Sequence, residues 1–235
     1  MKHALMLAAL ATPLVALAEE PQPSFTGEAE LGATITTGNT KTTSVKGRVD
    51  MRHNIMDWDN QYLLEGLFKE DEDIRTAENY RGLLQGNYRF TPTNYMFINL
   101  THEVDKFAGF DSKTTGAAGY GHRFFEQGST ILDVEIGPGV QSIKYSEPND
   151  MRETDWVAHG VLNFATDISE NATFKQIFVV DAGKKVTGRS ETSVSASLIG
   201  ALAMKVALVV KYDSEPQPTF EKTDTETNVT LLYKF

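Results

Sequence analysis

Apolar and polar side chains alternate residue by residue along much of this chain, and this alternation is the feature that most constrains its fold. Successive side chains of a β-strand point to opposite faces, so a period of two predicts strands with one apolar and one polar face. Within Thr43–Ile55 every Lys, Arg and Asp stands on one parity. The chain ends in the same way, with Val229, Leu231, Tyr233 and Phe235 at every second position.

Twelve such stretches can be placed, which predicts an all-β fold with no linker between domains. The predicted strands are Phe25–Thr36, Thr43–Ile55, Trp58–Lys69, a fourth through Tyr80 and Phe90, Tyr95–Lys106, Gly116–Phe125, Thr130–Lys144, Asp155–Asp167, Thr173–Gly183, Glu191–Ile199, Met204–Asp213 and Glu226–Phe235.

Composition excludes several classes of protein. The net charge of −10 argues against a nucleic-acid partner, because phosphate binding needs clustered Lys and Arg. The chain has no cysteine, so disulfides cannot stabilise it. After Ala18 no apolar run reaches the length of about 18 residues that a membrane-spanning helix needs, which excludes a helical membrane protein.

The alternation fits a closed antiparallel barrel in a membrane, with the apolar parity toward lipid and the charged parity toward the lumen. Closure matters because lipid offers no partner to an unpaired strand edge. The competing fold is a soluble periplasmic sandwich or lipocalin-like barrel, whose apolar parity would face inward. The dense mixed-sign charges, the Gly and Ala on the apolar face and the terminal Phe235 favour the membrane. We expect an up-and-down transmembrane β-barrel of about twelve antiparallel strands.

An export signal precedes the strands. Lys2 gives a positive start, Ala4–Val15 a short apolar core and Ala16-Leu17-Ala18 a cleavage motif. The apolar core is too short to span a bilayer. We expect residues 1–18 to be a signal peptide and residues 19–235 to be the outer-membrane β-barrel.

The connections between the predicted strands alternate in length. One set is short, such as Met56–Asp59 and Gly200–Ala203, and the other is mostly longer and more charged, such as Tyr145–Thr154 and Ser214–Thr225. In outer-membrane barrels short turns face the periplasm and longer loops face outward. With an even strand count, both termini are then expected on the periplasmic side of a Gram-negative outer membrane.

Three local expectations follow from the same parity. Aromatic residues near strand ends predict belts at the lipid headgroups; they are Trp58, Tyr62, Tyr88, Tyr95, Tyr120, Trp156 and Tyr233. Gly119 and Gly121 leave one face of a strand bare, which suits curvature or the close approach of an interior side chain. Val49→Arg should destabilise the barrel from the lipid face, whereas Asp50→Arg should fold normally.

The charged parity supplies the candidate functional residues. As lumen-lining pore candidates we take Glu30, Arg48, Asp50, Arg52, Glu65, Arg81, Arg89, Glu103, Arg123 and Glu135. These residues either line a narrow aqueous pore and set its selectivity, or pair across the lumen and plug it. Twelve strands lie between the eight that side chains fill and the 16–18 that leave a channel, so strand number alone leaves both alternatives open.

Catalysis is the less favoured alternative. Some outer-membrane barrels are lipid-modifying enzymes that use a Ser and a His, and four histidines follow the signal, at His53, His102, His122 and His159. No G-x-S-x-G motif is present, and the acidic run Glu70–Asp73 does not follow a calcium-loop pattern. We expect no catalytic residues, no metal site and no cofactor.

Several short segments carry a family resemblance through their order and spacing. They are Thr36-Thr37-Gly38-Asn39-Thr40, Thr76-Ala77-Glu78-Asn79-Tyr80, Asp105-Lys106-Phe107-Ala108-Gly109-Phe110-Asp111, Gly119-Tyr120-Gly121-His122-Arg123-Phe124 and Tyr212-Asp213-Ser214-Glu215-Pro216. Together they resemble a family of unknown function from Gram-negative bacteria known as salt-induced outer membrane proteins. The resemblance implies an outer-membrane location and a link to salt or acid stress, and it supplies no catalytic residues.

The sequence therefore predicts a porin-like barrel that acts as a small channel or as an envelope-integrity protein, and the resemblance to the family implies that it acts under osmotic or ionic stress. The expected partners are outer-membrane lipids, lipopolysaccharide and small solutes or ions. The barrel-assembly machinery is a further expected partner, because it recognises an aromatic C-terminal strand such as the one that ends in Phe235. A plugged structural barrel without transport is the alternative.

Overall fold

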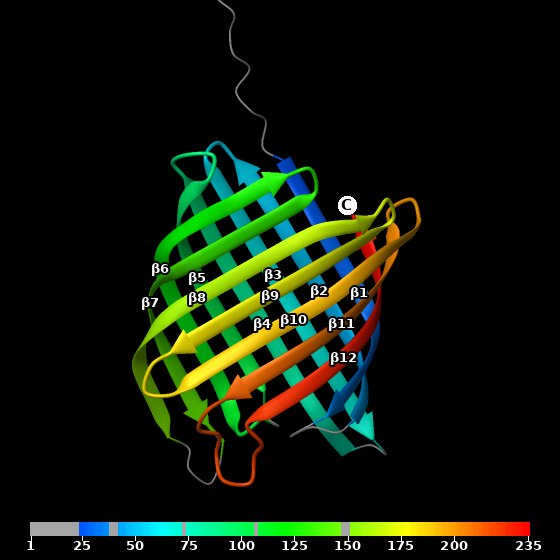
Figure 1. Cartoon of the computed structure of the whole chain (residues 1–235). Helices are drawn as coiled ribbons and strands as arrows, with labels where there is room; N and C mark the ends of the chain where they lie inside the picture. Colours follow the sequence, from blue (N-terminus) through cyan, green and yellow to red (C-terminus); the bar gives the residue numbers. More distant parts are fainter. Residues whose placement is uncertain (1–23, 38–41, 72–73, 106–107, 147–150) are drawn as a thin grey trace, which may run out of the picture.

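A computed structural model describes residues 24–37, 42–71, 74–105, 108–146 and 151–235. These residues form twelve strands and close into one barrel (Figure 1). The strands are β1 Ser24–Thr37, β2 Thr42–Ile55, β3 Trp58–Asp71, β4 Ile74–Arg89, β5 Asn94–Asp105, β6 Phe110–Gln127, β7 Thr130–Tyr145, β8 Arg152–Ser169, β9 Ala172–Ala182, β10 Val186–Ile199, β11 Leu202–Asp213 and β12 Thr223–Lys234. None of these residues belongs to a helix long and apolar enough to cross a membrane. The predicted signal peptide, residues 1–18, lies outside the described residues.

Each strand pairs antiparallel with the next one along the chain, and β12 returns to pair with β1. Phe235 completes this last seam: its N–H donates to the Gly27 carbonyl at 2.9 Å, and its carbonyl accepts from the Gly27 N–H at 2.7 Å. The Phe235 ring also covers Gly27. The predicted up-and-down antiparallel barrel is confirmed, and among the described strands its closure leaves neither edge of the sheet unpaired, as lipid requires.

The two faces of the wall have the polarity of a membrane barrel rather than that of a soluble protein. Leu31, Val49 and Leu64 point outward and are exposed, whereas Arg48 and Glu65 on neighbouring positions point inward and are buried. A soluble sandwich or lipocalin-like barrel would place these parities the other way round. The barrel is therefore a transmembrane barrel, whose outer apolar surface is covered by lipid.

Large aromatic side chains are exposed on the outer surface of the barrel. Six of the seven predicted belt residues are exposed there: Trp58, Tyr62, Tyr88, Tyr120, Trp156 and Tyr233. The prediction is wrong for Tyr95, which points inward and donates its hydroxyl hydrogen bond to Glu135 at 2.9 Å. The cause is visible in β5, where Tyr95 and Phe97 add apolar groups to the inward parity. Gly121 on β6 leaves room for the Tyr95 ring, which confirms the expected close approach of an interior side chain.

The barrel has two unlike ends. We call the end that carries Ser24 and Phe235 the terminus end; its turns include residues 56–57 and 200–201 (Figure 1). We call the opposite end the loop end; it includes the connection 214–222. The strands run further toward the loop end than predicted, since β8 begins at Arg152 and β10 at Val186. The difference in connection length between the two ends is therefore smaller than the sequence suggested.

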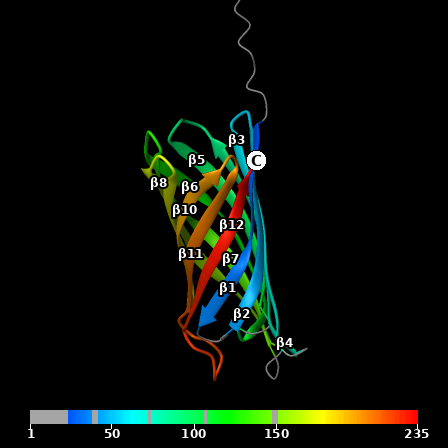
Figure 2. The ribbon, with the colours of Figure 1, turned by 90° about the vertical axis from the view of Figure 1, so that its right-hand side faces the viewer.

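The cross-section of the barrel is flattened. The wall is broad in Figure 1 and narrow in Figure 2, which is turned by 90°. Flattening brings opposite walls close enough for long side chains to meet across the interior. Because of this shape, inward charged side chains on opposite walls can form ion pairs with each other.

Candidate functional site

All ten predicted lumen residues lie on the inward parity of their strands. Seven of them are buried: Glu30, Arg48, Asp50, Glu65, Arg81, Glu103 and Glu135. The other three, Arg52, Arg89 and Arg123, lie toward the terminus end, where they line a cavity described below. The structure thus brings most of the predicted residues together in one interior.

A network of ion pairs crosses the middle of the barrel. We call it the central charge layer; its members are Glu30, Lys46, Arg48, Asp50, Glu65, Arg81, Arg189, Glu191, Lys205 and Glu226. Five members are cationic and five are anionic, so the formal charges of the layer balance. Since a buried charge without a partner is costly, this balance allows so many ions to lie inside one protein.

Arg48 on β2 is the most connected member of the layer. Its Nη1 lies 3.0 Å from Glu191 Oε1 on β10, and its Nη2 lies 3.2 Å from Asp50 Oδ2. Glu65 and Glu30 lie within 3.7 Å of the same guanidinium. A planar group with five N–H donors can serve several carboxylates at once, which a lysine ammonium does less well.

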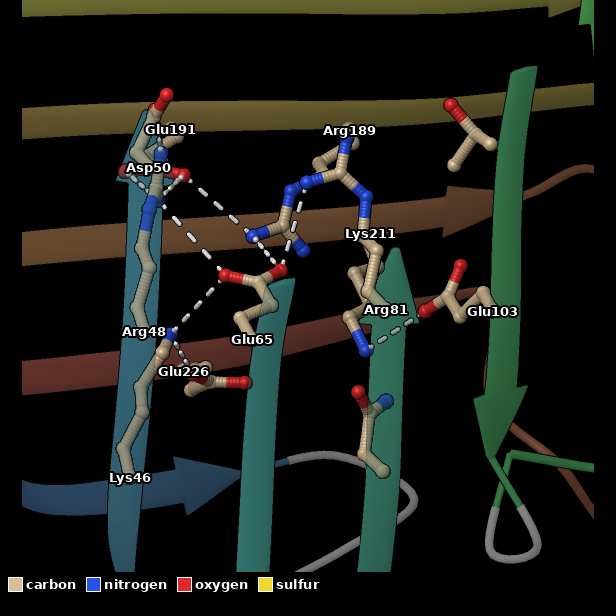
Figure 3. Close-up of polar contacts among 12 residues, drawn as sticks. Lys46, Arg48, Asp50, Glu65, Arg81, Glu103, Arg189, Glu191, Lys211 and Glu226 are labelled. Atoms are coloured by element: carbon tan, nitrogen blue, oxygen red, sulfur yellow. Dashed lines mark hydrogen bonds and ion pairs between the residues drawn. The ribbon is translucent and has the colours of Figure 1, made fainter. Parts of the chain in front are cut away.

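Some of these contacts join opposite walls. Arg189 Nη2 on β10 lies 3.1 Å from Glu65 Oε1 on β3, although β2, β1, β12 and β11 separate the two strands around the barrel. Figure 3 shows Arg189 and Glu191 reaching toward Arg48 and Glu65 from the other wall. The charges therefore narrow the lumen at this level.

A second set of pairs lies closer to the loop end. Lys211 Nζ on β11 lies 3.2 Å from Glu103 Oε1 and 3.4 Å from Asp105 Oδ2, both on β5. Lys113 Nζ on β6 lies 3.0 Å from Glu103 Oε2. This cluster again joins strands that are far apart in the sequence.

Two cavities occupy the interior on either side of the central charge layer. The terminus-end cavity has a volume of about 360 Å³ and is lined by residues such as Asn54, Asp59 and Arg123. The loop-end cavity has a volume of about 100 Å³ and is lined by residues such as Lys211 and Lys222. The two cavities share five lining residues, and we call this shared set the junction: Arg81, Thr101, His159, Val179 and Arg189.

The terminus-end cavity has ordered polar walls. Arg123 makes two hydrogen bonds to Asp133, at 2.7 and 3.0 Å, and Arg89 Nε lies 3.2 Å from Asp59 Oδ2. Glu135 accepts hydrogen bonds from Tyr95 and from the Gln85 amide, both at 2.9 Å. These contacts fix the positions of polar side chains that line the cavity.

Several interior residues were not among the sequence candidates. Arg189 lies outside the predicted strand, which begins at Glu191, whereas β10 begins at Val186. Lys205 and Lys211 stand on the inward parity of β11, and that alternation could have identified them. His159 is buried, and its Nδ1 lies 2.7 Å from Asp181 Oδ1. Its inward parity was likewise available in the sequence.

The chain matches a family model described as "Protein of unknown function, DUF481" over residues 29–235. It is 26% identical over 215 residues to "Uncharacterized protein YdiY" of Escherichia coli (strain K12), which covers 89% of this chain and 82% of that protein. Among solved structures it is similar to the NanC porin, with a TM-score of 0.58 and 5% identity over 88% of this chain and all of that one. It is also similar to the KdgM porin, with a TM-score of 0.48 and 10% identity over 88% of this chain and 99% of that one. The similarity to the NanC porin shows a shared fold, the closed β-barrel.

Proposed function

The chain belongs to the DUF481 family, whose function is unknown, and we propose that it forms a narrow outer-membrane channel for small hydrophilic solutes or ions. The observation that supports this most is the pair of interior cavities that share the junction residues inside a closed transmembrane barrel. A barrel interior packed solid from end to end would have no such space. The similarity to porins supports the same class of function.

The central charge layer sets the size limit of the proposed channel. Long side chains from both walls meet there, and the terminus-end cavity of about 360 Å³ is small. Only ions and small solutes then pass. Opening of the layer would require Arg189 to exchange its contact with Glu65 for contacts with water or with the passing solute.

Conductance of the refolded barrel in a planar lipid bilayer tests the proposal. We expect small discrete steps from the native protein and larger steps from Arg189→Ala, because this change removes a long side chain from the junction. Insertion is checked independently by a shift in gel mobility between boiled and unboiled samples. Inserted protein without steps, in both the native and the Arg189→Ala forms, would instead support a plugged structural barrel.

We further propose that the terminus end faces the periplasm. The short turns at this end support the assignment, as does the longer connection 214–222 at the loop end. Because the chain has no cysteine, single cysteines can report the orientation. In intact cells an impermeant maleimide should label Glu215→Cys at the loop end and should leave Glu170→Cys, in a turn of the terminus end, unlabelled. The reverse pattern would invert the assignment.

We assign the C-terminal strand to recognition by the barrel-assembly machinery, and the outer apolar surface to contact with lipid and lipopolysaccharide. Phe235 supports the first assignment because it forms the closing seam and presents its ring on the outer surface. Phe235→Ala should lower assembly in cells more than it slows refolding into vesicles. Equal effects on assembly in cells and on refolding into vesicles would indicate that Phe235 acts only by completing the seam between β1 and β12.

The resemblance to salt-induced outer membrane proteins supports a role in envelope permeability or integrity under osmotic or ionic stress. A strain that lacks the gene should then grow more slowly than its parent in high salt. The native gene should restore growth. Unchanged growth across salt concentrations would remove this part of the proposal.

A further inference from the structure

The charges that face the space inside the barrel differ from the charges of the central layer as a whole. The junction contains two guanidinium groups, Arg81 and Arg189, and no carboxylate. Glu65, which pairs with both arginines at 3.5 and 3.1 Å, lines neither cavity. Arg81 and Arg189 therefore face the space inside the barrel, whereas Glu65, the carboxylate that pairs with both, does not.

The junction histidine does not offset this arrangement. His159 Nδ1 lies 2.7 Å from Asp181 Oδ1, and Asp181 lines only the loop-end cavity. The Nε2 atom of His159 is buried and has no hydrogen-bond partner among the described residues. A neutral or protonated imidazole at this position adds no negative charge to the junction.

The terminus-end cavity shows the same excess of cationic groups. Its walls include six arginines, Arg48, Arg52, Arg81, Arg89, Arg123 and Arg189. They include four carboxylates, Asp59, Asp133, Glu135 and Glu191. The chain as a whole carries a net charge of −10, so this excess is a local property of the lumen.

The loop-end cavity, in contrast, is balanced. Its cationic groups are Arg81, Lys113, Arg189, Lys211 and Lys222. Its carboxylates are Glu103, Asp181, Asp213, Glu221 and Asp224. Preference between ions of opposite sign would therefore arise at the junction and in the terminus-end cavity.

We infer that the channel is selective for small anions, and that Arg81 and Arg189 at the junction determine this selectivity. The inference rests on the proposed channel function and names its class of solute. Arginine and lysine side chains at a constriction select anions by their field, and a guanidinium also matches carboxylate and phosphate oxygens with two parallel hydrogen bonds. The class accordingly runs from halide ions to small carboxylates and phosphates.

Reversal potentials in a KCl gradient across a planar bilayer test this inference. Arg81, Arg189 and the carboxylate of Glu65 with which both pair leave one unbalanced positive charge. Such a charge about 10 Å from the path, at an effective dielectric constant of about 40–80, favours chloride over potassium by roughly 4- to 16-fold. We expect the native barrel to show a permeability ratio in this range. Arg189→Gln should bring the ratio down toward unity, and Arg189→Lys, which keeps the charge, should retain most of it.

Arg152→Gln is the matched control. It removes the same charge from an exposed position at the loop end of β8, where the side chain donates to Ser142 Oγ and lines neither cavity. Its permeability ratio should equal that of the native barrel. A loss of selectivity in Arg152→Gln as large as that in Arg189→Gln would show that charge outside the lumen decides the ratio, and would overturn the role of the junction.

Arg189→Gln is expected to fold because Glu65 keeps Arg48, Arg81 and Lys46 within 4.0 Å. If it does not insert, Arg81→Gln removes the other guanidinium of the junction and should lower the permeability ratio in the same way. Conductance that is non-selective or selective for potassium would overturn the inference and leave the channel function intact. Absence of conductance from inserted protein would overturn the channel function, and the inference with it.

Discussion

An arginine placed on the lipid face at mid-strand gives the sharpest test of the membrane orientation of this barrel. Val49 lies in the middle of β2, between Ala29 on β1 and Leu64 on β3 in the strand register. Val49 is 39% exposed on the outer surface, and Leu31, Val45 and Leu64 on the same face of the wall are exposed as well. Val49→Arg would therefore put a guanidinium near the centre of the bilayer.

The expected cost depends on depth in the membrane. An arginine at the bilayer midplane of an outer-membrane barrel destabilises it by about 2–4 kcal/mol, and the penalty falls to about 0–1 kcal/mol near the interface. Ile55, on the same parity of β2 and at the terminus end, supplies the matched control. Val49→Arg should lower the free energy of unfolding by about 2–4 kcal/mol and Ile55→Arg by about 0–1 kcal/mol.

Urea unfolding of the protein refolded in phospholipid vesicles measures both values. The native protein, Val49→Arg and Ile55→Arg are compared at equal lipid-to-protein ratio. Equal losses in the two variants, or no loss in Val49→Arg, would show that this parity does not face lipid. The reasoning about the whole wall would then be refuted.

The structure changes the sequence-based expectation for Asp50→Arg. Asp50 accepts hydrogen bonds from Gln61 at 2.8 and 3.0 Å and from Arg48 at 3.2 Å. An arginine there would replace a buried partner of Arg48 with a like charge. Asp50→Arg should therefore be destabilising as well, and it is not a neutral control for the lipid face.

Two further substitutions test other parts of the structure. Gly121→Ala should destabilise the barrel by about 1–3 kcal/mol, because the added methyl group clashes with the Tyr95 ring. Urea unfolding should show that Gly121→Ala lowers the free energy of unfolding less when Tyr95→Leu is also present. An unchanged loss of free energy would contradict the clash. Lys185→Met should cost about 1–2 kcal/mol, because Lys185 donates to Asp213 at 2.9 Å and to Tyr145 at 3.0 Å between hairpins of the loop end. Burial opposes the charge of Lys185, but its hydrogen bonds to Tyr145 and Asp213 raise the pKa above its ordinary value. A raised lysine pKa stabilises the fold at pH values below the unfolded pKa, and this contribution is lost as the pH rises through the folded pKa. The difference in unfolding free energy between native protein and Lys185→Met should therefore shrink only at strongly alkaline pH. A difference that vanishes near neutral pH would contradict the raised pKa of Lys185.

The alternation of side chains was sufficient to predict the number of strands, the approximate position of each and the face that most of their residues occupy. Arg48, Glu65 and Arg81 lie inside as predicted, because parity is a local property of an extended chain and does not depend on which strands are neighbours. Where both parities carry apolar groups, the prediction was wrong. Tyr95 and Met96 are neighbours near the start of β5, and only the structure shows that Tyr95 is the inward one.

The ends of the strands were the other weak point. Arg189 stands beyond the predicted start of its strand, because a charged segment near Gly188 looks like a loop in the sequence. In the barrel, β10 continues to Val186, since its backbone groups are satisfied by β9 and β11. Tertiary pairing extended the strand where local sequence preference did not.

The sequence by itself determined that charges line the inside of a closed barrel and that apolar groups face lipid, because a bilayer tolerates neither a bare strand edge nor a charge on its lipid face. Only the tertiary structure decided which charges meet. The contact between Arg189 and Glu65 depends on closure of β1 on β12, on the stagger of the strands and on the flattened cross-section. No short stretch of sequence encodes these three quantities, since each arises from all twelve strands together. They also decide that arginines, rather than the carboxylates that pair with them, face the space at the junction.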